Sequence, residues 1–173
     1  MANLGTFGSV GPIQFGGIDA NAPVSHVTID SVAKQVALGT RVTYKGEEYV
    51  YVHNAAATDA SVGRAMVMSS LSGYSLTVSS LSGYDQPFCV VKHASIPAGG
   101  FGWGMTRGIT QVAVESTVAT GVWLTLGDDG AFKTFIGSSN TDTIQGAAVA
   151  KVLSSGTGIS TTGLPLAYVK CFG

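Results

Sequence analysis

The sequence predicts an all-β chain: a small β-barrel or β-sandwich of about ten short strands that follows an extended N-terminal arm. Three observations lead to this prediction. Runs of β-branched and aromatic residues recur along the chain, with turn-forming residues between them. Glycine supplies 24 of the 173 residues, about twice its ordinary share. Only 11% of the residues are charged, less than half the ~25% of an ordinary domain.

The arm and lead-in are predicted at residues 1–35, and the β-domain at residues 36–173. Between positions 3 and 23, Gly and Pro recur so often that neither helical nor strand periodicity survives. The segment nevertheless holds large apolar side chains at Phe7, Ile13 and Phe15, which a flexible tail would rarely carry. We expect an arm that packs on its own domain or docks on a neighbouring subunit, with these three residues as its candidate contacts.

The first strands are expected after this arm. Residues 24–36 fit a strand or a short helix, and their β-branched content favours a strand. The runs Arg41-Val42-Thr43-Tyr44 and Tyr49-Val50-Tyr51-Val52 flank a loop at residues 45–48 that contains Gly, which predicts a β-hairpin. A loop at residues 54–63 and a strand at residues 64–68 follow.

An internal repeat comes next. The hexapeptide Ser-Ser-Leu-Ser-Gly-Tyr occurs at residues 69–74 and again at residues 79–84. Two copies at this short spacing are too few for a solenoid. The repeat therefore predicts two adjacent turns around a strand or short helix at residues 75–78.

The central segment alternates aromatic residues with glycine. A buried strand is expected at residues 88–92 and a Pro-Gly turn at residues 96–100. In the strand that follows, Phe101 and Trp103 share one face with Met105, while the intervening glycines leave the other face bare for close approach. Phe101 and Trp103 are candidate interface residues, with a place in the core as the alternative.

The remaining elements complete the all-β pattern. A strand is predicted at residues 111–114. The Asp-Gly step within residues 127–130 predicts a hairpin between the β-rich segments 121–126 and 131–135. The final stretch gives, in order, a strand or short helix at residues 145–153, a loop at residues 154–163 and a strand at residues 166–172.

Composition and motif searches exclude several functions. Net charge is −1 with nine basic residues, which leaves little for a phosphate-binding surface, so no nucleic acid is expected. No apolar run reaches the ~20 residues of a membrane span, and the N-terminus lacks the pattern of a signal peptide. Phosphate-loop, dinucleotide-binding, nucleophile-elbow and metalloprotease motifs are missing. We therefore expect no enzyme, no catalytic residue, no cofactor and no metal, and we expect Cys89 and Cys171 to be reduced rather than paired.

The order of these motifs resembles the small head-auxiliary proteins of tailed bacteriophages. The resemblance spans residues 36–173 and lies in Tyr-Val-Tyr-Val-His-Asn at 49–54, Ile-Pro-Ala-Gly-Gly-Phe-Gly-Trp-Gly at 96–104, Gly108, and Gly-Val-Trp-Leu at 121–124 with Asp129-Gly130. It implies a capsid decoration or cement protein, located on the virion surface after assembly in the host cytoplasm. It further implies a homotrimer whose terminal arm contacts the major capsid protein. No family motif carries chemistry, so no active-site residue follows from it.

Three alternatives stay open at this point. One is another virion component, such as the coat subunit or a head or tail fibre module. Another is a carbohydrate-binding β-sandwich, with Tyr74, Tyr84 and Trp103 as its aromatic platform. An enzyme whose site is assembled only by the fold is the third.

Overall fold

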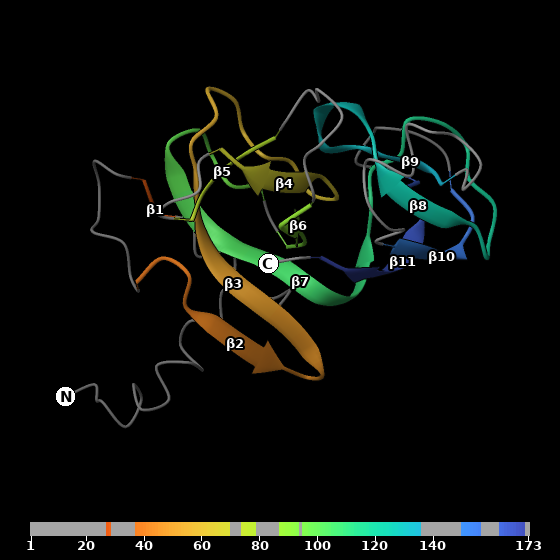
Figure 1. Ribbon diagram of the computed structural model, residues 1–173, viewed down its shortest axis with the longest axis horizontal. Helices are drawn as coiled ribbons and strands as arrows, with labels where there is room; N and C mark the ends of the chain where they lie inside the picture. Colours follow the sequence, from red (N-terminus) through yellow and green to blue (C-terminus); the bar gives the residue numbers. More distant parts are fainter. Residues whose placement is uncertain are drawn as a thin grey trace.

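The computed structural model describes residues 27–28, 37–69, 74–78, 87–93, 95–135, 150–156 and 163–171. Within these ranges the chain is all β, as the sequence predicts (Figure 1). The arm predicted at residues 1–35 falls outside the described residues except at positions 27 and 28. No helix with the length and hydropathy of a membrane span occurs in the described part of the chain.

The described strands share one sheet and follow one another closely in the chain. Their bounds are β1 (Val27–Thr28), β2 (Arg41–Tyr44), β3 (Glu47–Asn54), β4 (Ala65–Met68), β5 (Ser75–Thr77), β6 (Cys89–Val91), β7 (Gly100–Gln111), β8 (Trp123–Leu126), β9 (Phe132–Thr134), β10 (Ala150–Ser154) and β11 (Leu166–Lys170), with the 3-10 turn η1 (Asp128–Gly130) between β8 and β9.

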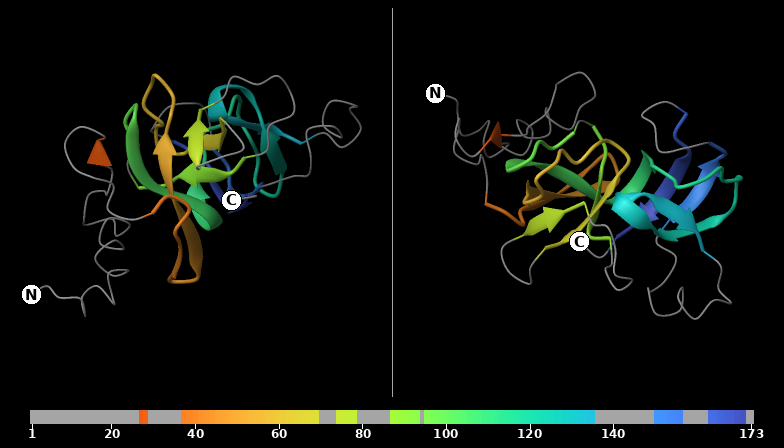
Figure 2. Two further views of the ribbon diagram at one scale, coloured as in Figure 1. Left: turned by 60° about the vertical axis from the view of Figure 1, so that its left-hand side comes forward. Right: turned by 90° about the horizontal axis from the view of Figure 1, so that it is seen from above.

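Five strands close into a ring, so this half of the chain takes the barrel form of the prediction. Their order is β3-β5-β4-β6-β7, and β3 also pairs with β7. In that closing pair Tyr51 lies opposite Trp103 and Val52 lies opposite Gly102. Closure leaves these strands without free edges, which are a liability in open sheets. Figure 2 shows the ring and the strands β8–β11 as two neighbouring groups.

Strand alternation gives the ring a closely packed interior. On β3, Val50 and Val52 point inward, whereas Tyr49 and Tyr51 belong to a second cluster on the opposite face. This is the period of two that the hairpin sequence predicts. The inward-facing cluster consists of Val50, Val52, Ala60, Met66, Leu76, Phe88, Cys89, Val91 and Ile96.

The bare glycine face of β7 turns into this interior. A Cβ atom on Gly102 would lie 2.8 Å from Cγ1 of Ile96, and one on Gly104 would meet the sulfur of Cys89. The glycine face of β7 is therefore closely approached, as predicted, and the approaching groups are the side chains of Ile96 and Cys89 from the same chain. The larger residues Phe101 and Trp103 face the opposite way.

Strand β7 is longer than predicted and joins the two groups of strands. It runs without interruption from Gly100 to Gln111, pairing first with β3 and β6 and then with β11. The separate strand predicted at residues 111–114 is therefore wrong. Gln111 ends β7, and Val114 forms an isolated bridge with Phe132. The prediction failed because residues 107–111 look polar and were not recognised as part of a strand. Buried and exposed residues nevertheless alternate there, with Thr110 buried between exposed neighbours.

The second group of strands has the order β7-β11-β10-β8-β9. The hairpin of β8 and β9 around η1 confirms the prediction from the Asp-Gly step. The buried side chains of these strands pack against the outer face of the ring. Leu124 and Val169 therefore belong to the same core cluster as Tyr51 and Trp103. One core cluster therefore spans both groups.

The predicted hairpin of β2 and β3 is also present, with a tighter turn than expected. Lys45 and Gly46 form the loop, with φ values of 50° and 81°. Two central residues with positive φ are typical of a type I′ turn, whose twist matches that of the flanking strands. The expected four-residue loop shortens because Glu47 and Glu48 pair with Tyr44 and Thr43.

A mutant cycle tests the packing of β7 against the ring interior. We expect Gly102→Ala to lower the free energy of unfolding by about 1–3 kcal/mol through overpacking, and Ile96→Ala by about 2–5 kcal/mol through cavity formation. In the double variant the new methyl group occupies part of the space that Ile96 vacates. Urea unfolding should therefore give a double-variant loss smaller than the sum of the single losses. Strictly additive losses would contradict this packing.

Candidate interaction surface

Among the residues that the structure describes, the exposed large apolar side chains gather on one face of the second group of strands. This apolar face consists of Ile109, Trp123, Leu153, Leu166 and Tyr168. Such a grouping differs from the scattered apolar residues of an ordinary surface, and it is the candidate interaction surface of the described residues.

The strand register aligns part of the apolar face into a row. Ile109 on β7 lies opposite Tyr168 on β11, Tyr168 lies opposite Lys151 on β10, and Lys151 lies opposite Trp123 on β8. Directly opposite residues of antiparallel strands project from the same side of the sheet. Four neighbouring strands therefore each contribute one side chain to the row.

Polar contacts orient the aromatic rings of this row. Nε of Arg107 donates to the hydroxyl oxygen of Tyr168 at 2.9 Å, and Nη1 of Arg107 lies 3.3 Å from Oε1 of Glu48. Nζ of Lys151 lies 5.3 Å from the centre of the Trp123 ring, within the range of a cation–π contact. The rings are thus held in place at the surface.

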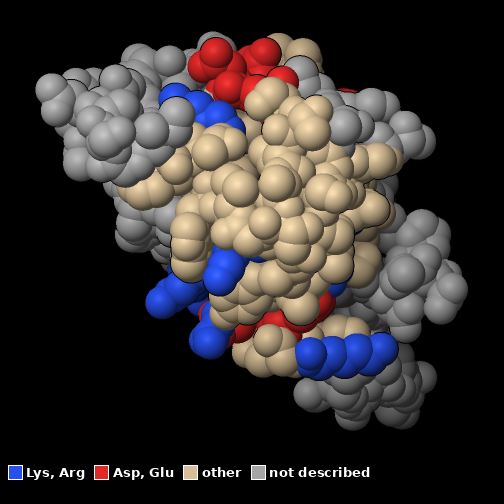
Figure 3. Space-filling view, turned by 90° about the vertical axis from the view of Figure 1, so that its right-hand side faces the viewer, with Lys and Arg blue, Asp and Glu red and all other residues tan. Residues whose placement is uncertain are grey.

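Charged side chains border the apolar side chains on this part of the chain. Lys151 and Lys170 are exposed beside the apolar side chains. An acidic corner, defined by Glu115, Asp128 and Asp129, is also exposed. Figure 3 shows a broad uncharged area with acidic side chains at its upper end, where basic atoms lie next to them, and with Lys and Arg side chains and further acidic atoms at its lower end.

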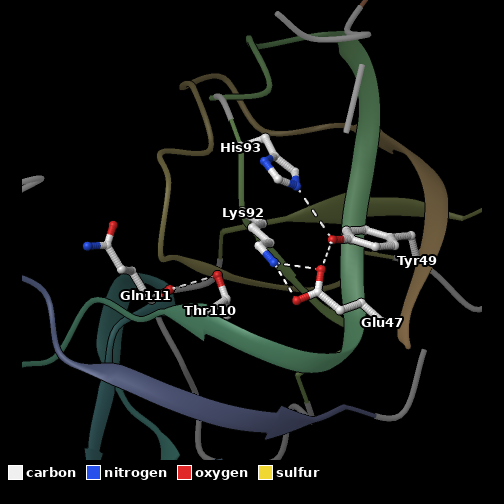
Figure 4. A network of polar contacts seen from close by, with 6 residues as sticks. All are labelled: Glu47, Tyr49, Lys92, His93, Thr110 and Gln111. Carbon is white, nitrogen blue, oxygen red and sulfur yellow. Dashed lines mark hydrogen bonds and ion pairs between the residues drawn. The ribbon is translucent and has the colours of Figure 1, made fainter. Parts of the chain in front are cut away.

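A polar cluster ties the start of β3 to the segment after β6 (Figure 4). Nζ of Lys92 lies 2.6 Å from both carboxylate oxygens of Glu47. The hydroxyl of Tyr49 donates to Glu47 and lies 3.4 Å from Nε2 of His93. Burial, with the hydrogen bond to Glu47, raises the pKa of Tyr49 well above its usual range. Tyr49 therefore stays protonated, and the cluster serves to join two segments.

The structure places two of the five sequence-predicted interface residues inside the chain. Phe101 and Trp103 are 9% and 7% exposed, and the ring of Trp103 lies 5.1 Å from that of Tyr51, centre to centre. This burial agrees with the alternative that they are core residues, and their interface role stays a prediction. The other three predicted residues, in the arm, lie outside the described residues.

The described residues do not assemble the aromatic platform of the carbohydrate-binding alternative. Trp103 is buried, and Tyr74 packs its ring edge against Phe88 with centres 5.8 Å apart. Tyr84 lies outside the described residues.

Within the described ranges, no group of three or more His, Cys, Asp or Glu side chains is placed to hold a metal ion. Cys89 and Cys171 are free thiols, as expected. Burial raises the pKa of Cys171 to about 12, so this thiol is protonated at neutral pH.

A polar hollow opens near the acidic corner, lined by Thr58, Asp59, Ser61, Arg64, Val78 and Asp129. Arg64 donates to the main-chain oxygen of Asp129. A carboxylate oxygen of Asp59 accepts from the amide of Ala98 at 3.0 Å. Two of its charged side chains therefore hold backbone segments together.

The apolar face is the feature that the sequence interpretation missed. Its signal is visible in β11, where Leu166 and Tyr168 alternate with the buried residues Ala167 and Val169. A strand in an antiparallel sheet with one wet face would carry polar residues at the exposed positions. In β11 two of the three exposed positions, Leu166 and Tyr168, hold large apolar or aromatic side chains instead.

Comparison with known proteins gives one structural similarity to report. No protein-family model and no curated protein matches the chain. The structure is similar to the crystal structure of the N base of head fiber gp8.5 from bacteriophage phi29, with a TM-score of 0.49 and 16% sequence identity. That match covers 70% of this chain and 93% of the phi29 chain.

Single-tryptophan variants test the contrast between the core and the apolar face. Trp103 is 7% exposed and Trp123 is 50% exposed. We expect the Trp103→Phe variant, which keeps Trp123, to emit at longer wavelength and to be quenched strongly by acrylamide in dilute solution. The Trp123→Phe variant should emit at shorter wavelength and resist quenching. Equal quenching of the two variants would contradict this placement.

The polar cluster predicts an alkaline loss of stability. The folded pKa of Tyr49 lies above its unfolded value of 10.0, so the folded state keeps a proton that the unfolded chain releases above about pH 10. Stability from this group is complete below that pH and is lost as the pH rises further. We expect Tyr49→Phe to lower the free energy of unfolding by about 1 kcal/mol at pH 7. Above about pH 10 the variant should lose stability less steeply than the wild type. Urea unfolding at several pH values measures both effects, and identical pH slopes would rule the cluster out as the cause.

Proposed function

We propose that the protein is a structural component of a tailed-phage virion that binds the outer surface of the assembled capsid and stabilises it. The observation that carries the structural role is the apolar face, on which five large side chains from four strands are exposed together, while the arm is the proposed contact with the capsid. A surface of this kind is suited to contact with protein rather than to chemistry.

The turn motifs of the sequence support the virion assignment. The segments at residues 49–54 and 96–104 that carry the resemblance to decoration proteins form the end of β3 and the entry into β7. These are the two strands whose pairing closes the ring. The resemblance therefore lies in residues that determine the architecture.

Binding to an assembled shell stabilises that shell by mass action, because the ligand binds the assembled state and not the free subunits. Many copies make the effect collective, and an arm that reaches a neighbouring capsomer raises the effective concentration of the second contact. A net charge of −1 limits repulsion between copies crowded on one surface.

The proposal includes specific partners and location. The partner is the major capsid protein, the protein acts as a homotrimer, and it resides on the virion surface after assembly in the host cytoplasm. It needs no cofactor, nucleic acid or membrane and has no catalytic role.

Mixing the purified protein with undecorated capsids tests the proposal. We expect the protein to sediment with the capsids and to raise the temperature at which they release their contents. A variant that lacks residues 1–23 should keep its β-type circular dichroism and bind less. The full-length variant Phe7→Ala/Ile13→Ala/Phe15→Ala should show a similar loss, which would assign the effect to these side chains rather than to chain length.

Two outcomes would overturn the proposal. One is a protein that neither sediments with the capsids nor protects them from heat. The other is the electron microscopic detection of the labelled protein on tails, which would favour the fibre alternative. Loss of the β-type spectrum after deletion of residues 1–23 would instead show that the arm belongs to the core.

A further inference from the structure

We propose that the apolar face is the contact between copies of this chain, and that the acidic corner of one copy lies against the Lys151 and Lys170 side of the apolar face of the next. This contact specifies the subunit association included in the proposed function and to that extent rests on it. Its test uses no capsid, so the two proposals can fail separately.

The composition of the apolar face fits a protein contact. Trp, Tyr and Arg are the residues that most often dominate the energy of protein interfaces, and Trp123, Tyr168 and Arg107 lie on this one face. All three belong to strands, and each side chain has a polar or cation–π partner. Little conformational entropy therefore remains to be lost when a partner binds.

Excess positive charge lies on the same face. Lys170 pairs directly with Arg107 across β11 and β7, and like charges in that arrangement are unfavourable. Glu48 compensates Arg107. Among the described residues, no carboxylate pairs with Lys170 or Lys151. These two lysines give the apolar face its positive charge, which carboxylates from a partner would balance.

The acidic corner supplies such carboxylates on an ordered segment. Glu115 accepts a hydrogen bond from the amide of Asp128, and its own amide donates to the main-chain oxygen of Phe132 at 2.9 Å. The main-chain oxygen of Asp129 accepts from Arg64. The corner is thus held by the backbone, while its carboxylates at Asp128 and Asp129 belong to exposed residues.

Charge also selects the arrangement of the copies. A two-fold contact of one apolar face with another would bring Lys151 and Lys170 near their own counterparts, which repel. A contact between different surfaces, corner to face, pairs opposite charges instead. Such a head-to-tail contact leaves one acidic corner and one apolar face free for further copies, so it builds assemblies larger than a dimer. We therefore infer a head-to-tail assembly rather than a two-fold dimer.

Charge exchange tests this contact in the full-length protein. The basic-side variant is Lys151→Glu/Lys170→Glu. The acidic-side variant is Asp128→Lys/Asp129→Asn, in which Asn is chosen because position 129 has a φ of 49° and Asn tolerates that conformation. A third variant combines all four substitutions, and Arg41→Glu on β2 is a matched charge reversal away from both surfaces.

Sedimentation velocity across a concentration series measures association, and circular dichroism checks folding. We expect the wild type and Arg41→Glu to associate beyond a dimer, and each single-side variant to have its dissociation constant raised at least about tenfold. The combined variant should regain part of the association, because the acidic corner no longer carries a net negative charge against the new carboxylates and Asp128→Lys supplies one opposite charge. Acrylamide should quench Trp123 less in the associated wild type than in the single-side variants.

Three results would overturn the proposal: a wild type that stays monomeric, single-side variants that associate like the wild type, or a folded combined variant that does not recover. A further outcome is a monomeric wild type together with a basic-side variant that no longer binds capsids. That result would assign the apolar face to the capsid contact and would also overturn the contact between copies.

Discussion

The pairing of β3 with β7 determines how the rest of the chain is arranged. It closes five strands into a ring and fixes which residues point inward. Because side chains alternate, the same register that sends Val52 inward places Tyr51 and Trp103 on the outside. A slip of one residue would exchange these two sets and put tryptophan where only glycine fits. The absence of side chains at Gly102 and Gly104 is therefore part of what defines the register.

The outer face of the ring then becomes the support for the second group of strands. Tyr51 and Trp103 share one core cluster with Leu124 and Val169, which come from β8 and β11. Each group covers apolar surface of the other, and β7 runs through both. What remains uncovered among the described residues is the far side of the second group. The location of the apolar face follows from this layering.

Local sequence patterns predicted many of the strands and turns. They did not predict which strands, distant in the sequence, pair with one another. The turn at Lys45–Gly46 and the Asp-Gly step at Asp129 each identified a hairpin, because turn chemistry is local. The length of β7 was missed because the buried positions of its second half hold Gly108 and Thr110 instead of large apolar residues. The apolar face was missed because its row joins Ile109, Tyr168 and Trp123 through pairings that only the folded sheet creates. The burial of Trp103 depends on the same distant pairings.

The two-part pairing of β7 has a consequence for synthesis on the ribosome. The first part of the strand finds its partner in β3, which has already emerged, and the ring can close early. The second part, Arg107 to Gln111, pairs with β11, which is synthesised more than fifty residues later. Until then its backbone donors and acceptors face solvent as an open edge. The nascent chain therefore passes through a stage that is half closed and able to pair with other chains, during which crowding of identical nascent chains favours misassembly.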